Sequence, residues 1–194
     1  GTYGGGIMTG IRDVSRESAT LTLSVHVSND DRTPRSFRMK NALLDAAGLE
    51  VASSLSGLTE LEPGQSLRLM TRMIVMKPAL WTTETPFLYT IRTELVSENS
   101  TVIDSREIRT GIRSVRITPD KGLLVNGEPV RLTGTNRHQE YPYIGYALSD
   151  EASYRDAFKI REAGFNLVRC SHYPPSPAFL DACDELGLLV IDAI

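Results

Sequence analysis

Polar and apolar residues alternate in three runs of the amino-terminal half. Residues 20–27, 65–70 and 88–95 place an apolar side chain at nearly every second position. A period of two is typical of a strand with one buried and one solvated face, as in antiparallel sheets. Turn signals separate the runs, at Asn29-Asp30-Asp31, Ala47-Gly48, Pro63-Gly64 and Glu98-Asn99. The pattern predicts an immunoglobulin-like β-sandwich over residues 1–112, entered through the first ten residues.

The pattern changes after Lys121. A hairpin is predicted around Asn126-Gly127, a pair that favours the tight turn between two strands. The remaining elements alternate between strand and helix, with strands at 130–135, 165–170 and 188–191, and helices from Ser149 to Gly164 and from Ser176-Pro177 to Gly187. This β-α-β-α-β order requires parallel strands with right-handed crossovers. Residues 113–194 are therefore predicted to be the N-terminal portion of a TIM barrel, (β/α)₈, in a multidomain β plus α/β protein.

Two helices can cover only one face of a three-stranded sheet. We expect Val168 and Val190 to lie on the uncovered face, where they would be left in water. Exposed apolar sheet faces and edges favour association. The sequence thus predicts that this segment opens a larger α/β domain, and that the chain self-associates or forms a homo-oligomer through the open barrel edge.

Charge and hydrophobicity indicate which classes of binding partner to expect, and the cysteines bear on the cellular compartment. The net charge of −3 comes from 21 basic and 24 acidic residues, well interspersed, which argues against nucleic acid. No apolar run is long enough for a membrane span, so no membrane partner is expected. Cys170 and Cys183 are predicted to be reduced thiols in a core. This leaves a cytoplasmic and a periplasmic or secreted location equally open.

A cluster of polar side chains follows the predicted strands of the second part. Arg169 and His172 come at the end of the second strand, His138 and Asn136 at the end of the first, and Asp192 at the end of the third. Ligands of α/β proteins bind at the carboxyl ends of parallel strands. The cluster predicts a site for a polyhydroxylated or anionic ligand. Asn136 and its neighbour Arg137 could instead fasten the loop after the first strand.

These motifs resemble glycoside hydrolase family 2, which includes β-galactosidases, β-glucuronidases and β-mannosidases. Every position of one family signature is present over residues 166–191, namely Asn166, Val168, Arg169, Cys170-Ser171, His172-Tyr173-Pro174, Phe179-Leu180, Asp184, Gly187 and Leu188 to Ile191. Residues 80–89 and Gly111-Ile112-Arg113 also resemble the sandwich of this family and its exit. The resemblance covers essentially the whole chain.

The resemblance implies a parent enzyme that cleaves terminal β-linked sugars with retention of configuration. Such enzymes use two carboxylates, one as nucleophile and one as acid/base. In the family these groups sit on later barrel strands, so we predict no catalytic residue within this chain and no turnover by the isolated chain. The implied substrate-binding residues are Arg169, His172, His138, Asn136 and Asp192.

Asn-Arg-His after the first strand resembles the galactosidase branch more than the glucuronidase branch, which suggests a parent acting on β-D-galactosides. No metal or cofactor is predicted within the chain, although the parent could use Mg²⁺ or Na⁺ through residues mostly outside it. Two alternatives remain open. One is a β-glucuronidase-type parent, and the other is a non-catalytic carbohydrate-binding or scaffolding sandwich, for which Trp81 is the one tryptophan available.

Overall fold

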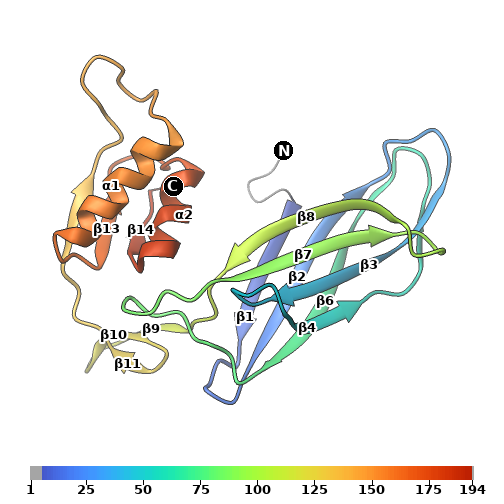
Figure 1. Ribbon diagram of the computed structural model, residues 1–194, viewed down its shortest axis with the longest axis horizontal. Coiled ribbons are helices and arrows are strands. Elements are labelled where there is room, and N and C mark those ends of the chain that lie inside the picture. The colour runs from blue at the N-terminus through green and yellow to red at the C-terminus, as the bar shows by residue number, and fades with distance from the viewer. Residues whose placement is uncertain (1–5, 194) are drawn as a thin grey trace. The chain divides into compact units, whose positions relative to one another are not determined.

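The computed structural model describes residues 6–193, which form two compact units (Figure 1). Of the described residues, 6–79 and 88–114 belong to unit 1, and 80–87 and 115–193 belong to unit 2. The chain therefore passes between the units three times. The stretch Leu80–Phe87 lies with unit 2, although it falls inside the predicted sandwich.

Unit 1 is a sandwich of two antiparallel sheets (Figure 1). One sheet has the order β1-β2-β6, and the other has the order β4-β3-β7-β8 with β5 paired to β3. The strands are β1 (Ile7–Arg12), β2 (Ser18–Ser28), β3 (Arg35–Leu44), β4 (Glu50–Leu55), β5 (Thr59–Leu61), β6 (Ser66–Met76), β7 (Tyr89–Val96) and β8 (Val102–Thr110). The predicted sandwich is confirmed. The predicted entry segment is wrong from Ile7 onward, because β1 pairs with β2, and residues 1–5 lie outside the described range.

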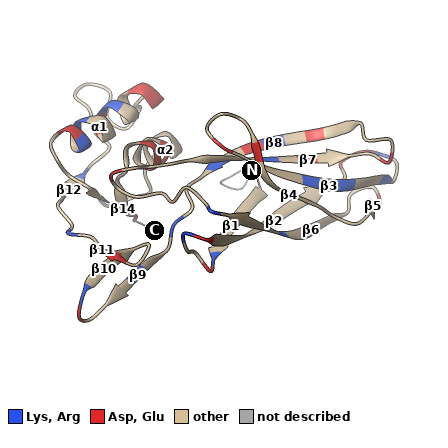
Figure 2. Cartoon of the chain, turned by 60° about the horizontal axis from the view of Figure 1, so that its bottom comes forward, with Lys and Arg blue, Asp and Glu red and all other residues tan. Residues whose placement is uncertain are grey.

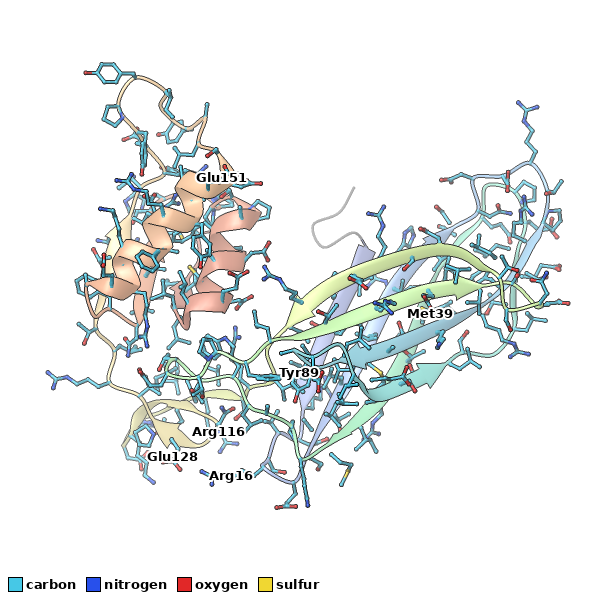
Figure 3. The ribbon with its side chains drawn as sticks, viewed as in Figure 1. Arg16, Met39, Tyr89, Arg116, Glu128 and Glu151 are labelled. Carbon is cyan, nitrogen blue, oxygen red and sulfur yellow. The ribbon has the colours of Figure 1, made fainter. Side chains whose placement is uncertain are left out.

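Alternation along the strands builds the core of unit 1. In β2 the side chains of Leu21, Leu23, Val25 and Val27 are buried, while the residues between them are more exposed. Met39 on β3, labelled in Figure 3, is fully buried. One buried polar side chain joins both sheets, since Asn41 on β3 donates to Thr71 of β6 at 3.0 Å and accepts from Thr93 of β7 at 2.7 Å. These partners satisfy an amide that burial would otherwise penalise.

Unit 2 starts with an antiparallel ribbon of β9 (Val115–Thr118), β10 (Gly122–Val125) and β11 (Glu128–Pro129). Asn126 and Gly127 form the two-residue turn between β10 and β11, both with positive φ, as the sequence predicts. A parallel sheet follows, with β12 (Gly134–Arg137), β13 (Leu167–Cys170) and β14 (Leu189–Ile191) in that order. The first strand lies at 134–137 and not at the predicted 130–135, whereas the second starts two residues later than predicted and ends at Cys170 as expected.

The helices α1 (Asp150–Glu162) and α2 (Pro177–Leu186) connect these parallel strands. Ser149 and Ser176 cap them, each accepting from a main-chain N–H of the first turn. Glu151, in the first turn of α1, is labelled in Figure 3. Hydrogen bonds to its carboxylate from the main-chain N–H of Glu151 and from the Ser149 side chain lower the pKa of Glu151. The face that α1 buries carries Ser153 and Ala157, whereas Tyr154 and Phe158 remain exposed. The large aromatic side chains of this helix therefore lie off its buried face.

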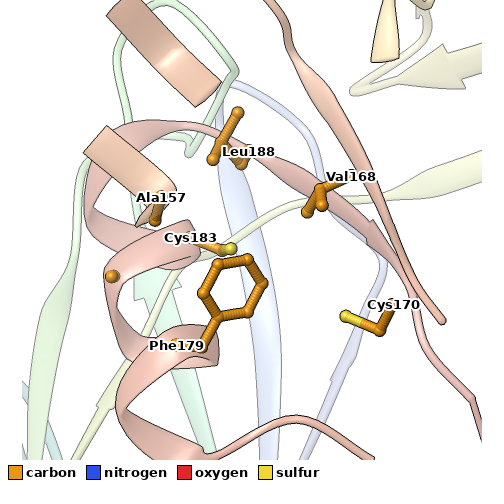
Figure 4. Close-up of a cluster of buried hydrophobic side chains, with 7 residues drawn as sticks. Ala157, Val168, Cys170, Phe179, Cys183 and Leu188 are labelled. Carbon is orange, nitrogen blue, oxygen red and sulfur yellow. The ribbon is translucent and has the colours of Figure 1, made fainter. Parts of the chain in front are cut away.

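A cluster of buried side chains fills the space between the helices and the parallel sheet (Figure 4). Its members are Ala157, Val168, Cys170, Phe179, Ala182, Cys183 and Leu188. Val168 is fully buried here and Val190 packs against the cluster, so their predicted placement on the uncovered face is wrong. The physical reason is the strand phase, because the side chains of Val168 and Val190 are neighbours in register and both point toward the helices. Self-association through the open edge of this sheet stays a prediction.

The segment Leu80–Phe87 fastens three elements of unit 2. Trp81 is buried, and its Nε1 donates to the main-chain oxygen of Asp184 on α2 at 2.8 Å. Its own main-chain oxygen accepts from the Asn126 side chain at 2.9 Å, and Glu84 pairs with Arg161 of α1 at 3.1 Å. The end of α2 therefore meets this segment closely. A Cβ on Gly187 would lie 2.3 Å from the main-chain oxygen of Thr83.

Acidic and basic side chains are interspersed over the elements of both units (Figure 2). Among residues 6–193, neither helix is long and apolar enough to cross a membrane.

We expect Gly187→Ala to destabilise unit 2 by more than the cost of placing alanine in a left-handed backbone conformation. Gly164 has a similar positive φ, 84° against 75°, but faces open space, so Gly164→Ala is the matched control. The control is expected to lower the free energy of unfolding by about 1 kcal/mol. Gly187→Ala adds the clash with Thr83, about 1–3 kcal/mol further. Urea denaturation measures both, and equal losses would contradict the close approach.

Neither cysteine is expected to react in the folded protein. Burial raises the pKa of Cys183 to about 12, and burial together with the charge of Asp192 raises the pKa of Cys170. Since the thiolate is the reactive form, a disulfide reagent at pH 8 should label both thiols only after unfolding in urea. Rapid labelling of one thiol before unfolding would show that the cluster in Figure 4 is open to solvent.

Candidate functional site

The parallel register places two predicted site residues and one residue beside a third in a single row across the sheet. Asn136 on β12, Arg169 on β13 and Ile191 on β14 are paired across the sheet, and all three are exposed. They lie on the face opposite the helices, because the intervening positions Arg137 and Cys170 are buried beneath α1 and α2. His138, His172 and Asp192 follow at the carboxyl ends of the same strands. All five predicted binding residues thus lie at one end of the sheet.

Arg169 is held by two neighbours of its own loop. Its Nη1 donates to Ser171 Oγ at 3.0 Å, and its Nη2 lies 3.4 Å from His172 Nδ1. A guanidinium can only donate, so in this contact Nδ1 of His172 can serve only as the acceptor. Within residues 6–193 no carboxylate forms an ion pair with Arg169. The guanidinium is therefore oriented by Ser171 and His172 and not by a carboxylate of the described residues.

His138 adds a second imidazole to the cluster. Its ring centroid lies 5.5 Å from that of His172, with the two planes at 77°, and 6.2 Å from that of Tyr173. Both imidazoles are exposed, which suits contact with a ligand more than packing in a core. The peptide bond between Ser171 and His172 is cis.

Asp192 directly follows β14 and is exposed. Its Oδ1 accepts from the main-chain N–H of Ala193 at 2.8 Å. Asp192 lies next to Ile191, which belongs to the same row as Arg169, so its carboxylate is at the same end of the sheet. Among the five predicted binding residues, Asp192 is the acidic one.

Arg137 is directed away from the cluster. The residue is 8% exposed, its Nε donates to Asp156 Oδ2 on α1 at 3.0 Å, and its guanidinium carbon lies 3.9 Å above the Phe179 ring. Its Nη2 lies 2.9 Å from the same carboxylate oxygen, an ion-pair contact without the alignment of a hydrogen bond. Of the two interpretations of Arg137, the structure supports fastening and not ligand contact.

Gln139 and Tyr173, which the sequence did not single out as site residues, brace the histidines. The Tyr173 hydroxyl accepts from the Gln139 main-chain N–H at 2.7 Å, and Gln139 Oε1 accepts from the Ser176 N–H at 3.1 Å. The segments after β12 and β13 are thereby tied to each other and to the start of α2. Tyr173 therefore shapes the turn after β13, and only the fold reveals Gln139 as its partner.

A second unexpected feature is the tyrosine-rich loop of residues 139–148, between β12 and α1. The Tyr141 hydroxyl donates to Asp156 Oδ1 at 3.0 Å and accepts from Arg155 Nη1 at 3.0 Å. The Tyr146 ring meets the Tyr173 ring edge to face, with centroids 5.2 Å apart. Glu140 raises the pKa of Tyr146 through a side-chain hydrogen bond. Asp156 thus serves both the buried Arg137 and this loop.

The arrangement has the chemistry needed to bind hydroxyl groups or a carboxylate. The imidazoles supply directional N–H donors, and Arg169 supplies a charged fork that matches a carboxylate. No group of three or more histidine, cysteine, aspartate or glutamate side chains is positioned for a metal ion within residues 6–193.

Comparison with known proteins identifies two adjoining family matches. Residues 9–113 match the family described as Glycosyl hydrolases family 2. Residues 115–194 match Glycosyl hydrolases family 2, TIM barrel domain.

Some of the similar proteins are named β-galactosidase and others β-glucuronidase. The chain is 44% identical over 118 residues to a β-galactosidase of Thermoanaerobacter pseudethanolicus, covering 60% of this chain and 16% of the relative. It is 34% identical to a β-galactosidase of Bacteroides ovatus, covering 92% of this chain and 21% of the relative. The crystal structure of a Bacteroides uniformis β-glucuronidase superimposes with a TM-score of 0.90 at 34% identity, covering 95% and 22% of the two chains. The chain spans about a fifth of the length of these relatives.

Removing the carboxylate of Asp156 should leave a buried charge without its partner. We expect Asp156→Ala to lower the free energy of unfolding by about 3 kcal/mol, since Arg137 cannot release its charge. Glu162→Ala, an exposed acid on the same helix, is the control and should leave the urea midpoint in place. A similar small change in both variants would show that the Arg137 guanidinium is solvated.

Proposed function

Because the chain belongs to glycosyl hydrolase family 2, we propose that it is part of a retaining exo-β-glycosidase acting on terminal β-D-galactosides. The observation that carries the proposal is the grouping of Arg169, His172 and His138 at the carboxyl end of the parallel sheet. In TIM barrels this end holds the active site.

Each residue has a distinct task in the proposed reaction. His138 and His172 donate to hydroxyls of the terminal sugar, and donors that shorten toward the transition state lower the barrier. Arg169 binds and keeps ionised a carboxylate supplied by another part of the parent protein, as a nucleophile requires. Asn136 and Asp192 contact the sugar from the neighbouring strands. The nucleophile and the acid/base come from outside this chain.

The choice of galactose depends on the relatives and not on Arg137. Its guanidinium contacts Asp156 and Phe179 on the helix side, so the Asn-Arg-His motif does not present Arg137 to a sugar. Two relatives named β-galactosidase support galactosides, and the similarity to a β-glucuronidase makes a glucuronide the second candidate. Any Mg²⁺ or Na⁺ that the parent uses is proposed to be held mainly by residues outside this chain.

A sandwich that binds carbohydrate without catalysis has little support. Such a module needs exposed aromatic platforms, and Trp81 is buried and bonded to Asp184. The segment that carries Trp81 belongs to unit 2 and not to the sandwich.

The proposal is tested with the full-length parent protein and two nitrophenyl substrates, a β-D-galactoside and a β-D-glucuronide. We expect faster turnover of the galactoside, and a loss of kcat/KM on Arg169→Ala of about 10²-fold or more, the usual effect of removing a donor aimed at developing charge. Arg116→Ala, an exposed arginine on β9, is the control and should leave kcat/KM unchanged.

Three outcomes would contradict parts of this proposal. Turnover of neither substrate would remove the activity, and a clear preference for the glucuronide would replace the sugar. Turnover by the isolated chain, if abolished by Arg169→Ala, would show that the catalytic carboxylates lie within residues 1–194.

A further inference from the structure

The loop of residues 139–148 displays large apolar side chains in solvent. Tyr143 at its tip is fully exposed, and Ile144 and Tyr146 are each more than half exposed. The loop rises beyond the start of α1 in Figure 1. Loops that carry aromatic groups without burying them are more often binding elements than packing elements.

This loop is held in a defined conformation. Tyr141 and Gly145 exchange two main-chain hydrogen bonds, of 3.1 and 3.0 Å, which close the tip into a narrow turn. The Tyr141 hydroxyl is fixed between Asp156 and Arg155 of α1. The tip is therefore presented on a fastened base, which reduces the entropy lost when a ligand binds.

Tyr143 does not stabilise the turn in which it lies. Its φ is 73°, a left-handed conformation that suits glycine or asparagine and is unfavourable for a bulky residue. Its side chain is fully exposed and so gains no burial that would offset this strain. Within residues 6–193, Tyr143 thus has strain without compensating burial, which points to a contact with a ligand.

The loop is continuous with the candidate site. Ring contacts run from His172 to His138 at 5.5 Å, from His138 to Tyr173 at 6.2 Å, and from Tyr173 to Tyr146 at 5.2 Å. A ligand held at the histidines would therefore extend toward Tyr146 and the tip. Glu140, the acid beside Tyr146, disfavours a negatively charged group there.

We propose that the loop of residues 139–148 is the binding surface for the leaving-group side of the substrate, with Tyr143 and Ile144 contacting an uncharged aromatic aglycone. The inference rests on the proposed function, since it assigns the histidine cluster to the sugar. Tyr143 is then a specificity residue that affects formation of the glycosyl-enzyme. Once the aglycone has left, hydrolysis of that intermediate does not depend on it.

The experiment uses the full-length enzyme and two substrates that share the preferred sugar, a nitrophenyl and a methyl β-glycoside. Tyr143→Asn removes the ring and suits the positive φ, so the melting temperature should stay the same or rise. We expect kcat/KM for the nitrophenyl glycoside to fall about two- to tenfold, the range of one aromatic contact. The kcat/KM for the methyl glycoside should fall less than that for the nitrophenyl glycoside. The inhibition constant of the free sugar should also change less.

Two further variants complete the design. Ile144→Ser should give a smaller loss with the same selectivity. Tyr154→Ala, an exposed tyrosine on α1 outside this loop, should change neither substrate. An equal fall for both glycosides in Tyr143→Asn, or no fall for either, would overturn the inference while leaving the glycosidase proposal intact. A wild-type enzyme that cleaves no β-glycoside would instead overturn the proposed function, and the inference with it.

Discussion

The parallel register of β12, β13 and β14 is the constraint on which unit 2 depends. Neighbouring residues in parallel strands point to the same side, so one register sends Asn136, Arg169 and Ile191 to one face and Arg137 and Cys170 to the other. A slip of one residue would exchange the two sets. It would bury Arg169 among apolar groups and move Arg137 away from Asp156. The same strand register therefore determines both the packing of the core and the placement of the candidate site.

Asp156 extends this constraint beyond the sheet. It neutralises Arg137 on the core side and holds the Tyr141 hydroxyl on the loop side. Gln139 and Tyr173 make a similar connection between the segments that carry His138 and His172. The exposed imidazoles are thus positioned by contacts that lie under them, which is how a solvent-facing cluster keeps a fixed geometry.

Much of this arrangement follows from the sequence, and the failures have physical causes. Alternation gives the sandwich, and Ser149, Ser176 and Gly187 mark the helix boundaries because their capping chemistry is local. The face on which Val168 lies was predicted wrongly, because a short apolar run does not reveal which side the helices cover. The partners of Arg137 and Gln139 lie 19 and 37 residues away and emerge only when the helices are docked. The strain at Tyr143 leaves no mark in the residue pattern.

The segment Leu80–Phe87 has a consequence for how such proteins can be recombined. Unit 2 receives Trp81 from a loop that leaves and re-enters unit 1, and Gly187 is shaped to meet Thr83 of the same loop. A cut at the end of the sandwich would therefore separate α2 from the indole that covers it. We therefore expect that replacing the sandwich of this chain would leave unit 2 intact only if the incoming sandwich carries a loop compatible with α2 and Gly187.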